Sequence, residues 1–229
     1  MSGPEDDDDD PGYASPPCLM HELDPIFREL KADSDARTAR DVARWRKAER
    51  ARLIAARREL DIAVRRAAAA RIASGLDTEL GEVGGLTVGC YWPIRGEPDL
   101  RPWIGELVER GAVCALPVVV RLGEPLLFHR WKPGERLVPG HWNIPVPAEP
   151  VPVVPDIVIA PLVGFDAGCY RLGYGGGFFD RTLAGLRGRV RAIGVGYASA
   201  RLATIFPQWH DVPMELLVTE EGIVRRTGA

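Results

Sequence analysis

The feature that most restricts the fold is a cluster of glycines between an apolar, strand-like run and a helix-like segment. Four of the five residues Gly173–Gly177 are glycine. Glycine loses more conformational entropy on folding than other residues, but it adopts positive φ and exposes backbone N–H groups. A glycine-rich turn entering a helix can therefore surround an anion. A purely structural turn is the alternative, although Arg171 and Asp180 at the two ends favour a phosphate and a Mg²⁺ ion.

The cluster differs from the two common phosphate-binding motifs. Walker A requires a lysine after its last glycine, and none follows Gly177. The dinucleotide fingerprint Gly-x-Gly-x-x-Gly would require glycine where the chain has Phe178. Neither motif therefore accounts for this turn.

Strand-like apolar runs alternate with helix-like segments along the chain. The predicted strands are 86–91, 112–120, 125–130, 157–164, 191–197, 215–219 and 222–225, and shorter helices are predicted at 99–110, 178–186 and 199–205. The alternation predicts an α/β fold: a three-layer α/β/α sandwich with a mostly parallel open sheet and a long N-terminal helical segment. Ligands of such sheets bind outside the carboxyl ends of the strands, where the glycine turn and residues 91–97 should lie.

The long helical segment has no glycine or proline from Ala36 to Ser74. Apolar residues recur at about 100° per residue, which predicts an amphipathic helix. We predict Ser34 or Asp35 as its N-cap and Gly75 as its terminator, with a possible restart at Asp61.

Charge divides the chain into an acidic arm and a nearly neutral body. Six of the 32 acidic residues lie in Glu5–Asp10, and the 29 Lys and Arg residues exceed the remaining 26 by three. We expect a disordered arm over residues 1–35 and a single domain over residues 36–229. The body has no bulk electrostatic reason to bind nucleic acid.

The remaining composition indicates the compartment and the partners. No apolar run approaches a membrane span, and no export signal opens the sequence. Four unclustered cysteines fit a reducing cytoplasm. We expect a cytoplasmic protein without a membrane or nucleic-acid partner, either a monomer or a weak homo-oligomer.

Several polar residues outside the glycine turn could take part in a site. Glu97 could bind an aminopyrimidine edge while Trp92 stacks on a flat ring. Equally, the negative charge of Glu97 could interact favourably with the N-terminal end of the following helix and its dipole. Asp211 could join Asp180 on Mg²⁺, and a simple turn aspartate is the alternative.

Two further segments could reach the same site. Arg46 and Arg50, one helical turn apart, could meet a phosphate, whereas a solvated basic face is the default for such a helix. The proline-rich segment 132–155 could be a surface linker, but Trp142 within it favours an ordered loop over a pocket.

The motifs of the sequence, taken together, resemble those of a known family. The run Pro161–Asp180 is similar to the signature of the 5-formyltetrahydrofolate cyclo-ligases, also called 5,10-methenyltetrahydrofolate synthetases. The other blocks that fit in order are 46–50, 91–97, 142–145 and 210–211, so that the resemblance covers about residues 42–225.

The resemblance implies an ATP- and Mg²⁺-dependent cyclisation of 5-formyltetrahydrofolate through a phosphorylated formyl group. It implies catalytic roles for Arg171, Tyr174 and Asp180, and metal ligation by Asp180 and Asp211. The implied nucleotide contacts are Arg46, Lys47, Arg50, Arg171, Leu172, Gly173, Tyr174, Gly175, Gly176, Gly177, Phe178 and Phe179. The implied contacts with the reduced folate are Trp92, Glu97, Trp142, Tyr174, Gly175, Gly176, Gly177 and Phe178.

The sequence also departs from the family pattern. Phe179 stands where the family usually has tyrosine, and the acidic arm is outside the usual pattern. Such variation leaves two alternatives open: a folate-binding or regulatory paralogue without turnover, and an ATP-dependent enzyme acting on a different small formyl or amide substrate.

Overall fold

The structure, a computed structural model, describes residues 25–226 of the chain, and side chains from residue 37 onward. The chain divides into two units, Met1–Asp41 and Val42–Ala229. Within the first unit, the described residues form the beginning of helix α1 (Pro25–Glu59). The acidic run Glu5–Asp10 lies outside the described residues.

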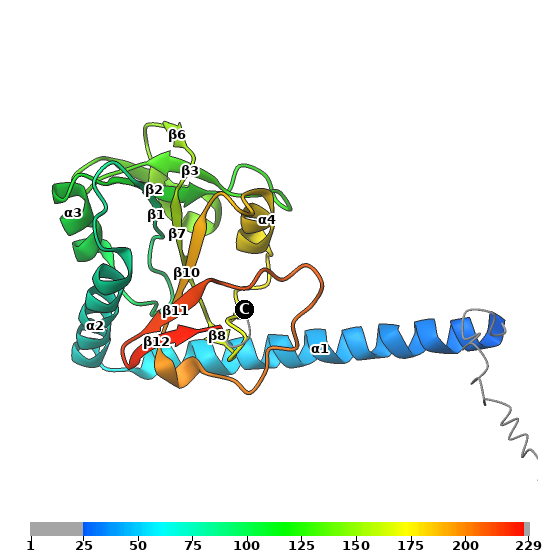
Figure 1. The fold of residues 1–229 in the computed structure, drawn as a ribbon. Helices are drawn as coiled ribbons and strands as arrows, with labels where there is room; N and C mark the ends of the chain where they lie inside the picture. The colour runs from blue at the N-terminus through cyan, green and yellow to red at the C-terminus, as the bar shows by residue number, and fades with distance from the viewer. Residues whose placement is uncertain (1–24, 227–229) are drawn as a thin grey trace, which may run out of the picture. The chain divides into compact units, whose positions relative to one another are not determined.

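An eight-stranded sheet forms the centre of the second unit, in the order β12-β11-β10-β7-β1-β2-β3-β6 (Figure 1). Its strands are β1 (Thr87–Gly89), β2 (Val113–Val118), β3 (Leu127–Arg130), β6 (Pro152–Val153), β7 (Ile157–Pro161), β10 (Arg191–Val195), β11 (Leu216–Thr219) and β12 (Gly222–Arg225). The run from β11 to β2 is parallel, and the strands outside it pair antiparallel. The prediction of a mostly parallel sheet is confirmed.

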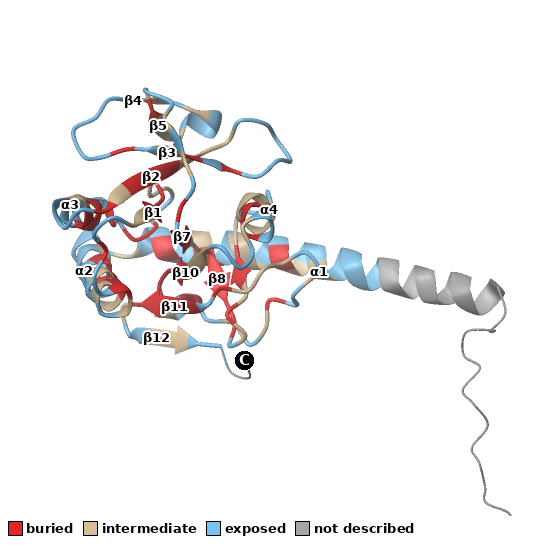
Figure 2. Ribbon diagram, turned by 45° about the horizontal axis from the view of Figure 1, so that its top comes forward, coloured by how far each residue is buried: buried red, intermediate tan, exposed pale blue. Residues whose placement is uncertain are grey.

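The sheet is apolar on both faces because alternate residues of each strand point to opposite sides. In β7, Ile157 and Ile159 join a core with α2 (Ile62–Leu80) and α3 (Arg101–Glu109). Val158 and Ala160 join a second core, which contains residues of α1 and of α4 (Phe178–Gly185). Figure 2 shows the buried strands between exposed helix surfaces. Helices therefore cover both faces, which confirms the three-layer sandwich.

The two N-terminal helices meet at Asp61, as the sequence predicted. The Asp61 side chain accepts a hydrogen bond from the backbone N–H of Ala63 at 2.7 Å, which caps α2. Two predicted boundaries are wrong. Helix α1 begins at Pro25, so neither Ser34 nor Asp35 is its N-cap. Helix α2 runs through Gly75 and ends at Leu80.

Tertiary packing explains why Gly75 does not end the helix. A Cβ atom at Gly75 would lie 2.8 Å from Cγ1 of Val218 in β11. The missing side chain thus lets α2 approach the sheet, and this contact outweighs the modest helix penalty of glycine, about 1 kcal/mol. Gly81, with φ of 62°, follows the last residue of the helix instead.

Short elements connect the layers and position the loops. They are β4 (Leu137–Pro139), the 3₁₀ turn η2 (His141–Asn143), β5 (Pro145–Pro147), β8 (Gly164–Phe165), β9 (Arg171–Leu172) and the 3₁₀ turn η3 (Ala198–Ala200). The predicted helix at 199–205 is thus only a short 3₁₀ turn. The proline-rich segment is ordered, because β4 and β5 pair across η2. The glycine turn follows β9, which pairs with β8 outside the main sheet.

Within residues 25–226, no helix combines the length and the apolar character that crossing a membrane requires.

Candidate active site

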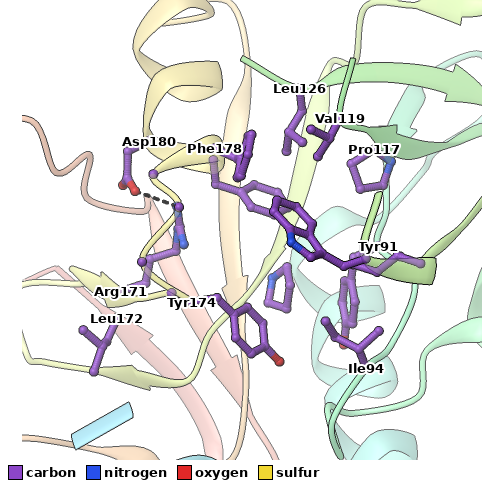
Figure 3. Close-up of a pocket in the computed structure, with 18 of the residues that line it drawn as sticks. Tyr91, Ile94, Pro117, Val119, Leu126, Arg171, Leu172, Tyr174, Phe178 and Asp180 are labelled. Carbon is purple, nitrogen blue, oxygen red and sulfur yellow. Dashed lines mark hydrogen bonds and ion pairs between the residues drawn. The ribbon is translucent and has the colours of Figure 1, made fainter. Parts of the chain in front are cut away.

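A cavity of about 450 Å³ opens at the carboxyl ends of the parallel strands. Pro161 ends β7, Tyr91 follows β1, and Val119 follows β2, and all three line it. Figure 3 shows Arg171 and Asp180 on one side of the cavity, with Tyr91 and Ile94 across from them. The position is the one expected for ligands of open α/β sheets.

The glycine turn forms one wall of this cavity and leads directly into α4. Gly175 and Gly177 have φ of 94° and 65°, a backbone region that other residues adopt at a cost. Gly173 allows the Arg171 side chain to approach the backbone closely, since a Cβ atom at position 173 would lie 2.6 Å from Nη1 of Arg171. The turn therefore needs glycine both for its backbone path and for its contact with the arginine.

The buried Arg171 and the partly buried Asp180 form an ion pair that joins the two ends of the turn. Arg171 Nη2 donates to Asp180 Oδ2 at 3.1 Å, and the Arg171 side chain is 4% exposed. Burial lowers the pKa of the Arg171 guanidinium, while Asp180 and Asp211 act in the opposite direction. Its Nε has no hydrogen-bond partner among the described residues. The pair places a cation with spare donor capacity beside the cavity.

A second arginine–carboxylate pair lies nearby, between Arg46 of α1 and Asp211. Arg46 also donates from Nε to the carbonyl of Ile205 at 2.9 Å and from Nη2 to that of Phe206 at 2.9 Å. Burial opposes ionisation of Asp211, but hydrogen bonds from Arg46 and from the backbone of Gln208 outweigh it and lower its pKa. This pair attaches the segment 205–211 to α1.

Arg50 reaches the glycine turn from the same helix. Its Nε donates to the carbonyl of Gly173 at 2.7 Å. Burial lowers the pKa of Arg50, and neighbouring Arg46 lowers it further. The cavity therefore has three arginines on its glycine side, two of which are paired with Asp180 and Asp211, so that this side keeps a net positive charge.

Glu97 is the buried acid at the other end of the cavity. Its Oε2 accepts from the backbone N–H of Ile94 at 2.8 Å, and its Oε1 accepts from the hydroxyl of Tyr174 at 2.8 Å. Arg57 of α1 lies 3.7 Å away, between its Nη2 and Glu97 Oε1. Burial raises the pKa of Glu97 to about 7, although Arg57 and the two hydrogen bonds act to lower it.

Aromatic rings form much of the remaining wall. Trp142 lies edge-to-face with Phe178, with ring centroids 5.6 Å apart, and it remains 63% exposed. Trp92 packs against Trp131 at 5.9 Å, and the guanidinium of Arg101 lies 5.0 Å from the centre of its ring. The cavity is thus cationic on one side and aromatic on the other, as a ligand with both phosphate and flat-ring character requires.

A family model described as the 5-formyltetrahydrofolate cyclo-ligase family matches residues 42–220. The chain belongs to the 5-formyltetrahydrofolate cyclo-ligase family. The family predicted from the sequence is therefore confirmed, and with it membership of a family of ligase enzymes.

Individual relatives agree with this assignment. The 5-formyltetrahydrofolate cyclo-ligase of Escherichia coli (strain K12) is 36% identical over 146 residues, which are 60% of this chain and 79% of that protein. The Mycolicibacterium smegmatis protein of the same name is 32% identical over 155 residues, 62% of this chain and 78% of that protein. The NMR structure of Aquifex aeolicus 5,10-methenyltetrahydrofolate synthetase superposes with a TM-score of 0.68 at 29% identity, covering 80% of this chain and 94% of that one.

The cavity of this cyclo-ligase family member brings most of the predicted residues together. The predicted residues that line it are Arg46, Arg50, Trp92, Glu97, Trp142, Arg171, Leu172, Gly173, Tyr174, Gly175, Gly176, Gly177, Phe178, Phe179, Asp180 and Asp211. Lys47 is exposed and is not part of the lining. It follows Arg46 in the helix and so faces a different direction.

Sequence reasoning missed residues whose importance depends on long-range contacts. Arg57 is the main example, because its helix was interpreted as a solvated basic face, yet its side chain is 6% exposed beside Glu97. Tyr91, Ile94 and His210 also line the cavity. The family resemblance already included Tyr91 and Ile94 in the block 91–97 and His210 in the block 210–211, but it gave these three residues no role.

The two predicted metal ligands suit Mg²⁺ in their chemistry. Asp180 Oδ1 accepts from the backbone N–H of Val212 at 3.3 Å, so the carboxylate lies beside the Asp211 segment. Within residues 25–226, no group of three or more His, Cys, Asp or Glu side chains could hold a metal ion. Two carboxylates without a closed cage fit Mg²⁺, which usually keeps waters and substrate phosphate oxygens as ligands.

Proposed function

We propose that this chain catalyses the ATP- and Mg²⁺-dependent cyclisation of 5-formyltetrahydrofolate to 5,10-methenyltetrahydrofolate, with release of ADP and phosphate. One observation carries the proposal: a single cavity joins the glycine turn and its arginines to the aromatic wall that ends at Glu97. A nucleotide and a reduced folate need these two environments side by side. Family membership supports the same activity.

The reaction consists of two displacements. The formyl oxygen attacks the γ-phosphorus of ATP, and the bond from that phosphorus to ADP breaks. The folate N10 amine then attacks the formyl carbon and loses its proton, and phosphate leaves with the former formyl oxygen. Phosphoryl transfer depends mainly on positioning and charge neutralisation, so no protein nucleophile is needed.

The glycine side of the cavity would bind the nucleotide. The backbone N–H groups of residues 173–177 would surround the terminal phosphates, and Arg171 and Arg50 would neutralise their charge. Asp180 and Asp211 would hold Mg²⁺, which supplies charge neutralisation on the phosphate oxygens. Binding of the phosphates requires that Arg171 share its guanidinium donors between them and Asp180.

The aromatic side would bind the folate. Glu97 would accept hydrogen bonds from the amine edge of the pterin ring, and Trp92 would contact its flat surface. Trp142, Tyr174 and Phe178 would complete the wall between the pterin and the nucleotide. This arrangement would place the formyl group near the glycine turn, where a displacement of about 1 Å is enough to slow the reaction strongly.

The experiment is direct. Purified protein is mixed with 5-formyltetrahydrofolate and Mg·ATP, and the absorbance of the methenyl product and the release of ADP are followed together. We expect both, in equal amounts, and neither after chelation of Mg²⁺ with EDTA. Folate binding without ADP release would indicate a paralogue without turnover, and ADP release only with another formyl or amide compound would indicate a different substrate.

We propose in addition that the protein acts in the cytoplasm on small molecules alone. Cys90, Cys114 and Cys169 are free and buried thiols, which suits a reducing compartment.

A further inference from the structure

Arg57 is a buried cation that the proposed reaction does not use. It lies near the end of α1, and its guanidinium contacts three separate segments of the chain. Its Nε donates to the carbonyl of Arg95 at 2.9 Å, and its Nη1 donates to the carbonyl of Leu162 at 3.2 Å. Both acceptors are backbone atoms. The guanidinium is therefore held in place independently of any acidic side chain.

The third nitrogen of Arg57 faces the cavity residues. Nη2 donates to the hydroxyl of Tyr174, which in turn donates to Glu97 Oε1 at 2.8 Å. The same nitrogen lies 3.7 Å from that carboxylate oxygen. Arg57, Tyr174 and Glu97 thus form a closed network from α1, the glycine turn and the loop after β1.

Close backbone packing supports this network. A Cβ atom at Gly96 would lie 3.3 Å from the carbonyl oxygen of Arg57. The end of α1 therefore rests directly on the loop that carries Glu97, and a small residue at position 96 permits it. Since Arg57 is fixed to the same loop through Arg95, α1 and the loop should move together.

Few other charged groups face Glu97. Arg95 comes from its own loop and is exposed. Tyr174 approaches from the glycine turn, and the hydroxyls of Tyr91 and Tyr197 lie close enough for the charge of Glu97 to raise the pKa of each, after burial as the main cause. Among the described residues, Arg57 is thus the buried cation that stabilises the ionised carboxylate.

We propose that Arg57 is a positioning residue for substrate: it stabilises the carboxylate form of Glu97, aligned with Tyr174, so that the acid accepts hydrogen bonds from the amine edge of the folate. The proposal rests on the proposed function, since it assigns the reduced folate to Glu97. An ionised carboxyl accepts on both oxygens, whereas a protonated one presents an O–H toward the ligand donors. Near neutral pH Glu97 is present in both forms, and loss of the Arg57 charge would shift it toward the protonated one.

The first test needs no ligand. The carboxyl carbon of Glu97 is followed by ¹³C NMR against pH, with Glu97→Gln used to assign its signal. A charge within 4–6 Å typically changes a carboxyl pKa by about 1 to 3. We therefore expect Arg57→Gln to raise the titration midpoint of Glu97 by at least about one pH unit. Arg57→Lys, which keeps the charge, should leave the midpoint closer to that of the wild type.

Control variants distinguish the effect of the Arg57 charge from that of a folding defect. Arg58→Gln removes the same charge from the exposed neighbouring position and should not move the midpoint. Arg57→Met provides a second neutral variant if Arg57→Gln does not fold, as judged by circular dichroism. An unchanged Glu97 midpoint in a folded neutral variant would overturn the proposal.

The second test measures binding of 5-formyltetrahydrofolate by calorimetry from pH 6 to pH 9. At pH 7 we expect Arg57→Gln to bind about tenfold more weakly than the wild type, and the difference should shrink as the pH rises and Glu97 ionises. A purely structural defect would weaken binding equally at every pH. If the wild type binds no folate, the proposed function fails, whereas the ligand-free titration still decides the role of Arg57.

Discussion

Arg171 donates a hydrogen bond to Asp180 across the glycine turn, at 3.1 Å between Nη2 and Oδ2, so that one partly buried ion pair closes the proposed phosphate-binding loop. The pair joins β9 to the first turn of α4. It therefore determines both the geometry of the loop and the charge beside the cavity.

Asp180→Asn should lower both stability and activity. The change leaves a buried guanidinium without its counter-ion, which typically costs about 3 kcal/mol of unfolding free energy. It should also remove most of the cyclisation rate, because a proposed Mg²⁺ ligand is lost. Urea denaturation and ADP release measure the two effects.

Asp99 provides the matched control for that variant. It pairs with Arg101 at 2.6 Å, but both side chains are nearly half exposed. Asp99→Asn should therefore cost less than about 1 kcal/mol and leave the rate unchanged. Equal losses for the two aspartates would show that burial of the Arg171 pair has no special importance.

Gly175→Ala should strain the glycine turn. Its φ of 94° disfavours any Cβ, and the added atom would lie 3.3 Å from Cζ of Arg50. We expect a loss of about 1 to 2 kcal/mol in unfolding free energy and a raised KM for ATP. Gly185→Ala is the control, since nothing lies within 4 Å of its Cβ position. Gly185→Ala should leave the unfolding free energy unchanged or raise it by up to about 1 kcal/mol. Equal effects of the two substitutions would contradict strain at Gly175.

Glu97 should make the protein less stable as the pH rises. Its pKa is raised from 4.5 to about 7 by burial, so between these values the folded state binds more protons than the unfolded state. Stability relative to Glu97→Gln should therefore be highest below pH 4.5 and fall through pH 7, by up to about 3 kcal/mol. Denaturation of both proteins from pH 4 to pH 8 measures this. A constant difference would contradict the raised pKa.

Gly75→Ala should destabilise the packing of α2 on the sheet. The new Cβ would lie 2.8 Å from Val218 Cγ1. Overpacking of this kind costs about 1 to 3 kcal/mol, which exceeds the gain of about 1 kcal/mol from a better helix former. In the Val218→Ala background, where the clash is absent, the same substitution should become stabilising. Thermal unfolding of the four proteins completes the cycle, and a uniform gain from alanine would refute the packing argument.

The family and the centre of the site were predictable because their signals are local. Positive φ at Gly175 and Gly177 favours glycine because other residues adopt this backbone region at a cost. Strand-like runs and the capping residue Asp61 are similarly read from neighbouring residues. The end of α2 was not predictable in this way, because continuation through Gly75 depends on a contact with Val218.

By itself, therefore, the sequence determined the alternation of strands and helices, the glycine turn and the family to which the chain belongs. These depend on periodicity and on backbone conformations that act over a few residues. Only the tertiary structure decided that Arg46 pairs with Asp211 and that Arg57 faces Glu97 rather than water. Such pairs join residues far apart in the chain, and whether a charge is buried depends on which segments fold over it.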